Sequence, residues 1–215
     1  MIYCIGDSHA SFFTGKEAMT KAWPKGNSGN GPYFRGIRIG PMSAHNLLVN
    51  AHKVSDIAEA VGVGKEDYLM LPHGSADCRV EIPKLLKIDC FAEGSDNFVF
   101  GWDAIKSAIK LSTNKYMEAI SFFAERYRVI VWGVIGAGVS PMWSNGTQKE
   151  RNAIAEMFNF CVQELCDKNG IPFVCVFDEM VKDGITKDGW LIDDVHLNLN
   201  KMPLVIEKFR EAGLI

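Results

Sequence analysis

The chain has 215 residues, of which 47% are hydrophobic and 23% charged, a balance typical of a globular protein with a sizeable buried core. The formal net charge of −3, without any run of Lys or Arg, argues against nucleic acid as a partner. The longest apolar stretch, residues 129–139, is broken by glycines and is far shorter than the ~20 residues that span a bilayer, so no membrane partner is expected.

The N-terminus and the cysteines indicate a cytoplasmic protein. No basic segment precedes the first apolar run, as it would in a secretory signal. The cysteines form no CxxC pair and show no Cys/His spacing typical of a metal site, so we expect reduced, buried thiols and no bound metal. They are Cys4, Cys78, Cys90, Cys161, Cys166 and Cys175.

Short apolar strands alternate with amphipathic helices along the chain. Strands are predicted at 2–5, 35–39, 67–73, 128–133 and 172–177. Helices are predicted at 43–50, 54–61, 103–127, 148–168 and 203–212. Between the first two strands, residues 11–33 are rich in Gly and Asn and are expected to be irregular. The alternation predicts one α/β domain over residues 1–215, a three-layer α/β/α sandwich with a five-stranded parallel sheet.

The first predicted strand ends at Gly6-Asp7-Ser8. In an open α/β sheet, ligands bind beyond the carboxyl ends of the strands, so the Ser8 hydroxyl is expected to face a site. The alternative is that Ser8 only caps the N-terminus of the following helix.

A second polar group lies near the C-terminus, where Asp193 and His196 are three residues apart. A serine hydroxyl becomes a nucleophile when a base takes its proton, and that base needs a carboxylate to fix its tautomer. The pair could supply both. The alternative is a solvated acidic loop in which Asp193 or Asp194 caps the last helix and His196 is incidental.

Four short blocks, in order, together resemble the SGNH (GDSL-like) hydrolase family. They are Gly6-Asp7-Ser8, Gly40, Gly74-Ser75-Ala76-Asp77 and Asp193-x-x-His196. The resemblance extends over essentially the whole chain and implies a flavodoxin-like fold that uses no cofactor. It also implies that Ser8 is the nucleophile, His196 the general base and Asp193 its orienting carboxylate, with the backbone amides of Ser8 and Gly40 as oxyanion-hole donors.

The third block departs from the family pattern. The family usually has Gly-x-Asn-Asp, whose Asn donates to the oxyanion, and here Ala76 takes that place. A donor of this kind is commonly worth about 3 kcal/mol in the transition state. The run from Gly74 to Arg79 is similar to a Gly-x-x-Asp-Cys-Arg variant, found in a subgroup linked to glycan metabolism. This likeness suggests Arg79 as a substitute donor or a substrate clamp, and the alternative is an ion pair with Asp77 or Glu81.

Other polar and aromatic residues are weaker candidates for binding substrate. His9, His73 and Asp77 adjoin the strand ends and are predicted to contact substrate, whereas His45 and His52 are expected to be structural or solvated. Aromatic residues in predicted loops could stack on a sugar or simply pack in the core. They are Trp23, Tyr33, Trp143 and Trp190.

We therefore predict a serine esterase that removes small acyl groups such as acetyl from a small molecule or, more specifically, from a carbohydrate. The sequence does not say whether the acyl group passes to water or to another alcohol. One alternative is a metal-dependent phosphoesterase with ligands among Asp7, His9, His73, Asp77 and His196, although its later Gly-Asp-x-x-Asp and Gly-Asn-His blocks are missing. Another is a glycan-binding module that lost activity with the change at Ala76.

Overall fold

The computed structural model describes residues 1–16, 19–87, 98–140 and 144–215. Its main sheet has the strand order β2-β3-β1-β4-β5-β6. The strands are β1 (Ile2–Gly6), β2 (Asn27–Asn30), β3 (Phe34–Arg38), β4 (Tyr68–Leu71), β5 (Arg128–Trp132) and β6 (Phe173–Val174). All neighbours in the sheet are parallel except β2 and β3. The five-stranded parallel sheet is thus confirmed, with an additional antiparallel edge strand.

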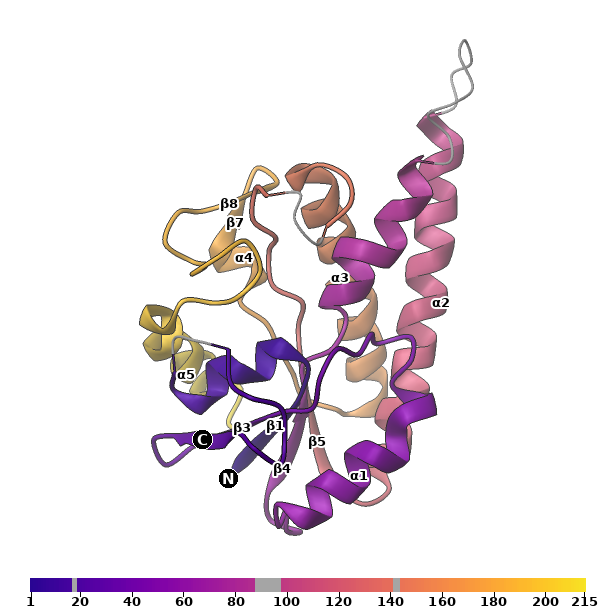
Figure 1. Ribbon diagram of the computed structural model, residues 1–215. Helices are drawn as coiled ribbons and strands as arrows, with labels where there is room; N and C mark the ends of the chain where they lie inside the picture. Colours follow the sequence, from indigo (N-terminus) through magenta and orange to yellow (C-terminus); the bar gives the residue numbers. More distant parts are fainter. Residues whose placement is uncertain (17–18, 88–97, 141–143) are drawn as a thin grey trace.

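Helices cover both faces of this sheet, which confirms the α/β/α sandwich (Figure 1). One face is covered by α1 (Ala51–Ala60), α2 (Phe98–Ala124) and α3 (Gln148–Asn169). The other is covered by the 3₁₀ helix η1 (Ser8–Thr14) and by α5 (Met202–Glu211). Along β5, Val129 and Val131 pack on the first face, and Ile130 and Trp132 pack on the second. Because successive side chains point to opposite faces and both faces are covered, the strands are apolar throughout.

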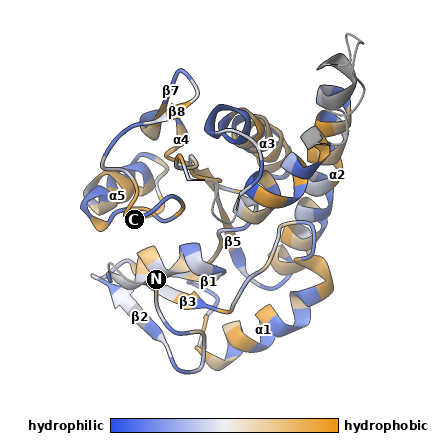
Figure 2. Ribbon diagram, turned by 45° about the horizontal axis from the view of Figure 1, so that its top comes forward, coloured by the Kyte–Doolittle hydropathy of each residue, from blue (hydrophilic) through white to orange (hydrophobic). Residues whose placement is uncertain are grey.

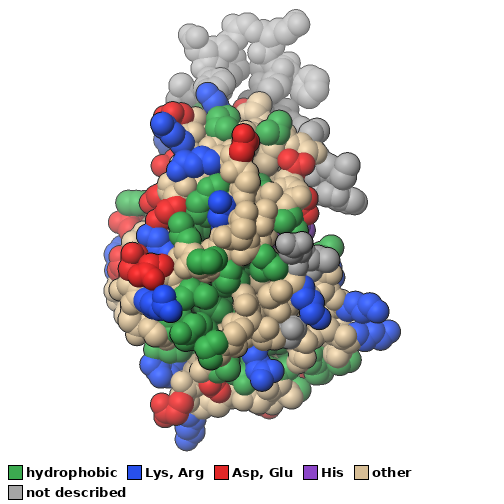
Figure 3. All heavy atoms as spheres, turned by 90° about the vertical axis from the view of Figure 1, so that its left-hand side faces the viewer, with side chains coloured by type: hydrophobic (Ala, Val, Ile, Leu, Met, Phe, Trp, Pro, Cys, Tyr) green, Lys and Arg blue, Asp and Glu red, His purple; other side chains and the backbone are tan. Residues whose placement is uncertain are grey.

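The helices have the amphipathic pattern that this arrangement requires. Polar and apolar residues alternate along α1 and α2 in Figure 2, as expected for helices with one face on the core and one in solvent. At the start of α3, Thr147 and Glu150 form a reciprocal capping box, and the helix ends at Gly170 in the left-handed region. On the side of the molecule that Figure 3 shows, hydrophobic side chains reach the surface among charged ones.

Three predictions of local structure are wrong. Residues 11–33 are not wholly irregular, because they contain most of η1 and the whole of β2. Residues 43–47 form turns instead of a helix, and only the short 3₁₀ helix η2 (Leu48–Asn50) leads into α1. The last strand is limited to β6, after which the chain enters α4 (Phe177–Met180) and the hairpin of β7 (Val181–Lys182) with β8 (Ile185–Thr186).

The remaining short elements lie on two connections. The third predicted strand continues into η3 (Asp77–Glu81) and η4 (Ile82–Lys87), and η6 (Leu199–Lys201) precedes α5. Of the six cysteines, Cys90 lies outside the described residues, and the other five are free thiols. None of the described helices is both long and apolar enough to cross a membrane.

Candidate active site

Ser8 lies at the turn between β1 and η1, at the carboxyl end of the sheet. The cap of η1 is Asp7, whose Oδ1 accepts a 2.9 Å hydrogen bond from the His9 backbone N–H. The alternative that Ser8 is the cap is therefore wrong. The Ser8 hydroxyl forms no side-chain hydrogen bond with any described residue, so it is available for chemistry.

Asp7 is buried beneath this turn. Its burial raises the pKa of the carboxyl to about 7, although the hydrogen bond from His9 and the positive charge of Arg79 act in the opposite direction. A carboxyl group of this kind is partly protonated at neutral pH. It provides the cap of η1 without placing a permanent negative charge next to Ser8.

The second half of the site is the turn that carries Asp193 and His196. The Nδ1 atom of His196 is 2.7 Å from Asp193 Oδ2, and Asp193 Oδ1 accepts backbone N–H bonds from Val195 and His196 at 2.8 and 2.7 Å. Partial burial alone would raise the pKa of the Asp193 carboxyl, but these hydrogen bonds lower it below its usual value. Asp193 thus stays ionised and holds the imidazole in the tautomer that leaves Nε2 free to accept a proton.

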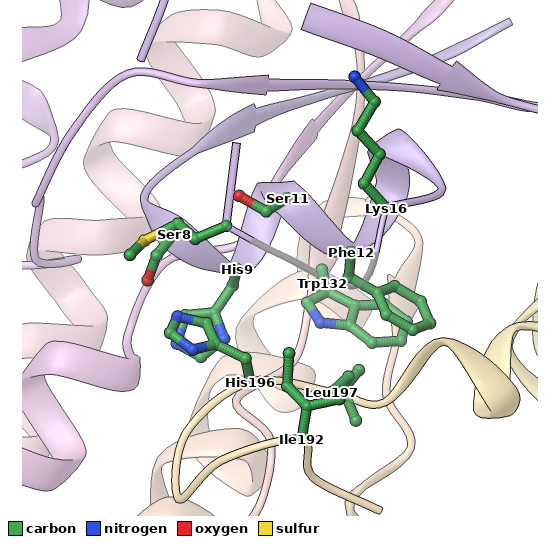
Figure 4. A pocket seen from close by; sticks show the side chains of 10 residues that line it. Ser8, His9, Ser11, Phe12, Lys16, Trp132, Ile192, His196 and Leu197 are labelled. Carbon is green, nitrogen blue, oxygen red and sulfur yellow. The ribbon is translucent and has the colours of Figure 1, made fainter. Parts of the chain in front are cut away.

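Ser8 and His196 line the same small pocket, together with His9 (Figure 4). The Nε2 atom of His196 is buried and has no hydrogen-bond partner among the described groups. The structure shows no hydrogen bond between this atom and the Ser8 hydroxyl. Such contacts are often long in ligand-free enzymes and tighten around the substrate.

The loop after β3, which contains Gly40, is held at one end by the last residue of β1 and at the other end by Asp77. The Ile39 N–H donates to the Gly6 carbonyl at 2.7 Å. Further along, the Asp77 carboxylate accepts from the Ala44 N–H at 2.7 Å and from the Ser112 hydroxyl at 2.7 Å. Gly40 has a φ of 104°, which other residues rarely adopt, so the sharp turn here depends on glycine.

Asp77 is 2% exposed, and the hydrogen bonds that its carboxylate accepts join parts of the protein to one another. The carboxylate connects three distant parts of the chain, namely the loop after β3, η3 and α2. Its predicted contact with substrate remains a prediction.

Arg79 lies among the groups of the site and forms no ion pair with Asp77 or Glu81, so that alternative is wrong for these described residues. Its Nε donates to the Ser75 hydroxyl at 3.0 Å, and its Nη1 is buried without a partner in the described structure. Burial lowers the pKa of the guanidinium, and the Asp7 and Asp193 carboxylates oppose this shift. Ala76 itself provides no side-chain donor.

His9 and His73 are both buried, and both are kept neutral. The His9 ring lies 5.4 Å from that of His196, tilted by 42°, and its pKa is lowered well below the usual value by burial and then by Arg79. Burial also lowers the pKa of His73 to about 4, and the His73 ring packs edge-on against Tyr116. His9 lines the Ser8 pocket, whereas His73 is not among its lining residues.

Unpaired buried polar atoms concentrate at this end of the sheet. Of the eight side-chain atoms in the described structure that are buried without a partner, five belong to His9, His73, Arg79 and His196. Buried polar atoms are nearly always hydrogen-bonded in folded proteins, so a cluster of exceptions needs an explanation. Two of these residues, His9 and His196, line the pocket that contains Ser8, where a ligand could supply the missing partners.

The apolar part of the pocket was missed by the sequence analysis. It consists of Phe12, Met19, Trp132, Ile192 and Leu197, with Ser11 and Lys16 as further lining residues. Phe12 follows Ser8 by four residues on η1, and this closeness in sequence could have indicated it, but Trp132 and Leu197 are brought in only by the tertiary fold. Met19 and Ile192 are 52% and 44% exposed, so the pocket opens beside apolar side chains.

The loop aromatics do not line this pocket. Trp190 is buried in the core on the η1 and α5 face of the sheet, and Trp23 packs against the core on the opposite face. Tyr33 is half-buried against Phe34, and Trp143 lies outside the described residues. In the same described ranges, no three His, Cys, Asp or Glu side chains are grouped as metal ligands would be. The ligand set of the phosphoesterase alternative is therefore not assembled from those residues.

Comparison with solved structures places this arrangement among known folds. A Bacteroides fragilis protein described as an acylhydrolase aligns over 100% of this chain and 88% of its own, with a TM-score of 0.59 and 15% identity. An acetyl xylan esterase aligns over 99% of both chains, with a TM-score of 0.55 and 14% identity. A member of the lipolytic G-D-S-L family from Veillonella parvula aligns over 98% and 96%, with a TM-score of 0.51 and 14% identity. The chain has the SGNH hydrolase fold.

At these identities the likeness establishes the fold and no more. No protein-family profile and no curated protein sequence matches the chain. In the SGNH hydrolase fold of this chain, Ser8 and His196 line one pocket beyond the carboxyl end of β1, and the loop of Gly40 follows the neighbouring strand β3. This is the crevice where open α/β sheets bind ligands.

Proposed function

We propose that this chain is a serine esterase that hydrolyses small acyl esters through an acyl-enzyme on Ser8. The observation that carries the proposal is the pairing of the Asp193–His196 hydrogen bond with an unengaged Ser8 hydroxyl in one pocket. The structural neighbours named acylhydrolase, acetyl xylan esterase and lipolytic G-D-S-L protein support the same reaction class.

The mechanism follows from the positions of these groups. The Ser8 oxygen attacks the ester carbonyl carbon while its proton passes to His196 Nε2, and Asp193 stabilises the resulting imidazolium. The tetrahedral intermediate then expels the alcohol, which takes the proton from His196. In the second half, water loses a proton to His196 and attacks the acyl carbon, and the carboxylic acid leaves as Ser8 regains its proton.

The oxyanion formed in each half needs fixed donors. The backbone N–H groups of Ser8 and Gly40 are two of them in this proposal, and Arg79 is the third. Arg79 suits the role because its Nε is fixed by Ser75 while Nη1 is buried and unpaired within the described residues. A guanidinium thus takes the place of the missing Asn side chain.

The size of the pocket favours a small acyl group. Its free volume is about 20 Å³, whereas even one bound water needs about 10–15 Å³. The apolar walls formed by Phe12, Trp132 and Leu197 suit a methyl group such as that of acetyl. The unpaired Nε2 atom of His9, which lines the same pocket, suits a hydroxylated leaving group, so we propose an acetylated carbohydrate as the substrate.

The test is a hydrolysis panel of p-nitrophenyl esters, from acetyl to longer acyl chains, run beside acetylated sugars. Acetyl esters should react fastest, with activity lost in Ser8→Ala and unchanged by a chelator. Retention of more than a few per cent of turnover in folded Ser8→Ala would exclude Ser8 as the nucleophile. Chelator-sensitive activity on phosphate esters would support the metal-dependent alternative, and sugar binding without turnover would support a binding module.

A further inference from the structure

The turn of residues 191–197 is held together by its own hydrogen bonds. The Ile192 N–H donates to the His196 carbonyl at 3.0 Å, and Leu191 forms a β-bridge with Leu197. The bonds that join Asp193 to His196 also stay within this turn. These contacts fix the carboxylate relative to the imidazole, but they do not fix the imidazole relative to Ser8.

Asp194, the next residue, joins the turn to a different part of the chain. Its carbonyl accepts a 2.7 Å hydrogen bond from the Gly138 N–H, and its Oδ1 accepts from the Ser140 N–H at 3.0 Å. The contact is so close that a Cβ on Gly138 would lie 2.4 Å from Asp194 Oδ1 and 2.5 Å from its Cα. Any side chain at residue 138 would therefore push the backbone of the turn away.

The segment that receives Asp194 is itself fixed by side chains of α3. Arg151 is fully buried, and its Nη2 donates to the Gly138 carbonyl at 2.7 Å. Asn152 accepts from the Ala137 N–H at 2.7 Å, and Asn159 exchanges two 2.8 Å bonds with the backbone of Val134. These side chains brace the chain that continues from β5, so Asp194 is attached to a rigid support.

We infer that Asp194 is a positioning residue, which sets where His196 stands relative to Ser8 by attaching its turn to the segment at Gly138 and Ser140. The inference rests on the proposed function of Ser8 and His196. The reason for a catalytic effect is geometric, because a displacement of about 1 Å in a reacting group can lower the rate by ~10²-fold. Asp194 does not touch the reacting atoms and acts through His196.

The first test compares Asp194→Ala with Asp194→Asn. Asp194→Ala loses the bond from Ser140 and should lower kcat by 10- to 100-fold, with KM nearly unchanged. Asp194→Asn keeps an oxygen that can accept this bond and should stay within about threefold of wild type. Asp188→Ala is the matched control, because Asp188 is an exposed acid in the preceding loop, and it should leave kcat unchanged.

Gly138→Ala tests the same contact from the other side. Gly138 does not have a positive φ, so alanine is compatible with the backbone and acts only through its clash with Asp194. Its kcat should fall as in Asp194→Ala. This variant keeps the inference testable if Asp194→Ala does not fold.

The labelling rate per active site distinguishes a positioning role of Asp194 from a purely structural one. The rate at which a fluorophosphonate labels Ser8 should fall per titrated active site, whereas a structural defect would only reduce the number of sites. The proton resonance of His196 Nδ1 should persist in Asp194→Ala, because its bond to Asp193 lies within the turn. Loss of that resonance would show that Asp194 maintains the pair itself and would overturn the positioning role.

The remaining outcomes distinguish this inference from the proposed function. If wild-type protein is labelled at Ser8 and Asp194→Ala is labelled equally fast, the inference fails alone. If Asp194→Asn lowers kcat as much as Asp194→Ala does, the effect depends on the charge of Asp194, and the positioning role through the hydrogen bond from Ser140 also fails. If the wild-type protein is not labelled at all, the proposed function fails first.

Discussion

Asp77 and Asp193 are two aspartates that are held in opposite ways. Asp77 is buried, and the groups that it binds come from residues 32 to 35 positions away in the sequence. Asp193 has a side chain that is 50% exposed, and all its partners lie within three residues. Asp77 therefore determines how the loop after β3 and α2 fit together, and Asp193 determines only the orientation of the His196 imidazole.

This difference indicates that stability and chemistry depend on different aspartates. A buried carboxylate with three donors is costly to remove, because the donors lose their partner in a dry environment. A half-exposed carboxylate can be replaced at little cost in folding, because water solvates what remains. Substitutions at the two aspartates should thus affect different measurements.

Asp193→Asn should give the largest effect on activity. The amide favours the wrong tautomer of His196, and a change of this kind costs up to ~10⁴-fold in kcat in serine enzymes. The midpoint of urea unfolding should stay close to that of wild type. A large fall in unfolding free energy without a fall in kcat would reverse the roles assigned to the two aspartates.

Asp77→Ala should give the largest effect on stability. It leaves the Ala44 N–H and the Ser112 hydroxyl unpaired, and we expect a loss of about 3 kcal/mol in the free energy of unfolding. Urea titration measures this loss directly. The control is Asp56→Ala, an exposed acid on α1, which should change the unfolding free energy by less than about 0.5 kcal/mol.

Arg79 follows Asp77 by only two residues, but its replacement is predicted to affect activity. If it donates to the oxyanion, Arg79→Ala should lower kcat and kcat/KM together by about 10²-fold, with KM little changed. A rise in KM with kcat preserved would instead make Arg79 a clamp for the substrate. The measurement is steady-state kinetics on p-nitrophenyl acetate.

Ala76→Asn sharpens the Arg79 prediction. Restoring the amide should raise the rate in the Arg79→Ala background and have little effect in wild type, because both side chains would serve one oxyanion. A full rate in Arg79→Ala alone would leave the third donor unidentified. Ser75 and His73 would then be the next residues to test.

Asp7 should change how the free energy of unfolding depends on pH. Its pKa is about 7 in the folded chain and near 3.8 when the chain is unfolded, so the folded state holds the proton more tightly. This contribution is fully present below pH 3.8 and is lost as the pH rises to about 7, with a slope of at most about 1.4 kcal/mol per pH unit. Urea unfolding at pH 5, 6, 7 and 8 should show less of this decline in Asp7→Asn.

The contrast between local and long-range contacts also explains what could be predicted from the sequence. The parallel strands and the Asp193-x-x-His196 pair depend on short-range patterns, namely alternating burial and a three-residue spacing. The turns at residues 43–47 could not be predicted, because the Asp77 carboxylate that holds Ala44 and His45 is more than 30 residues away. The edge strand β2 was missed because its Asn and Gly residues have low strand propensity and only pairing with β3 makes it a strand.

The pocket walls depend even more on long-range structure. Phe12, Trp132 and Leu197 come from η1, β5 and the C-terminal turn, and no local signal connects them. The position of Arg79 was also open, since an ion pair with Asp77 or Glu81 was equally compatible with the spacing. Its hydrogen bond to Ser75 became visible only in three dimensions.

The central claim, that Ser8 is a nucleophile activated by His196, is tested most directly by labelling with a fluorophosphonate and mapping the adduct by mass spectrometry. The account predicts one adduct per chain, on Ser8, with labelling abolished in His196→Ala. Ser11 lines the same pocket, but its hydroxyl is engaged by Thr20, so it should remain unmodified. No adduct on Ser8, or equal labelling in His196→Ala, would contradict the account.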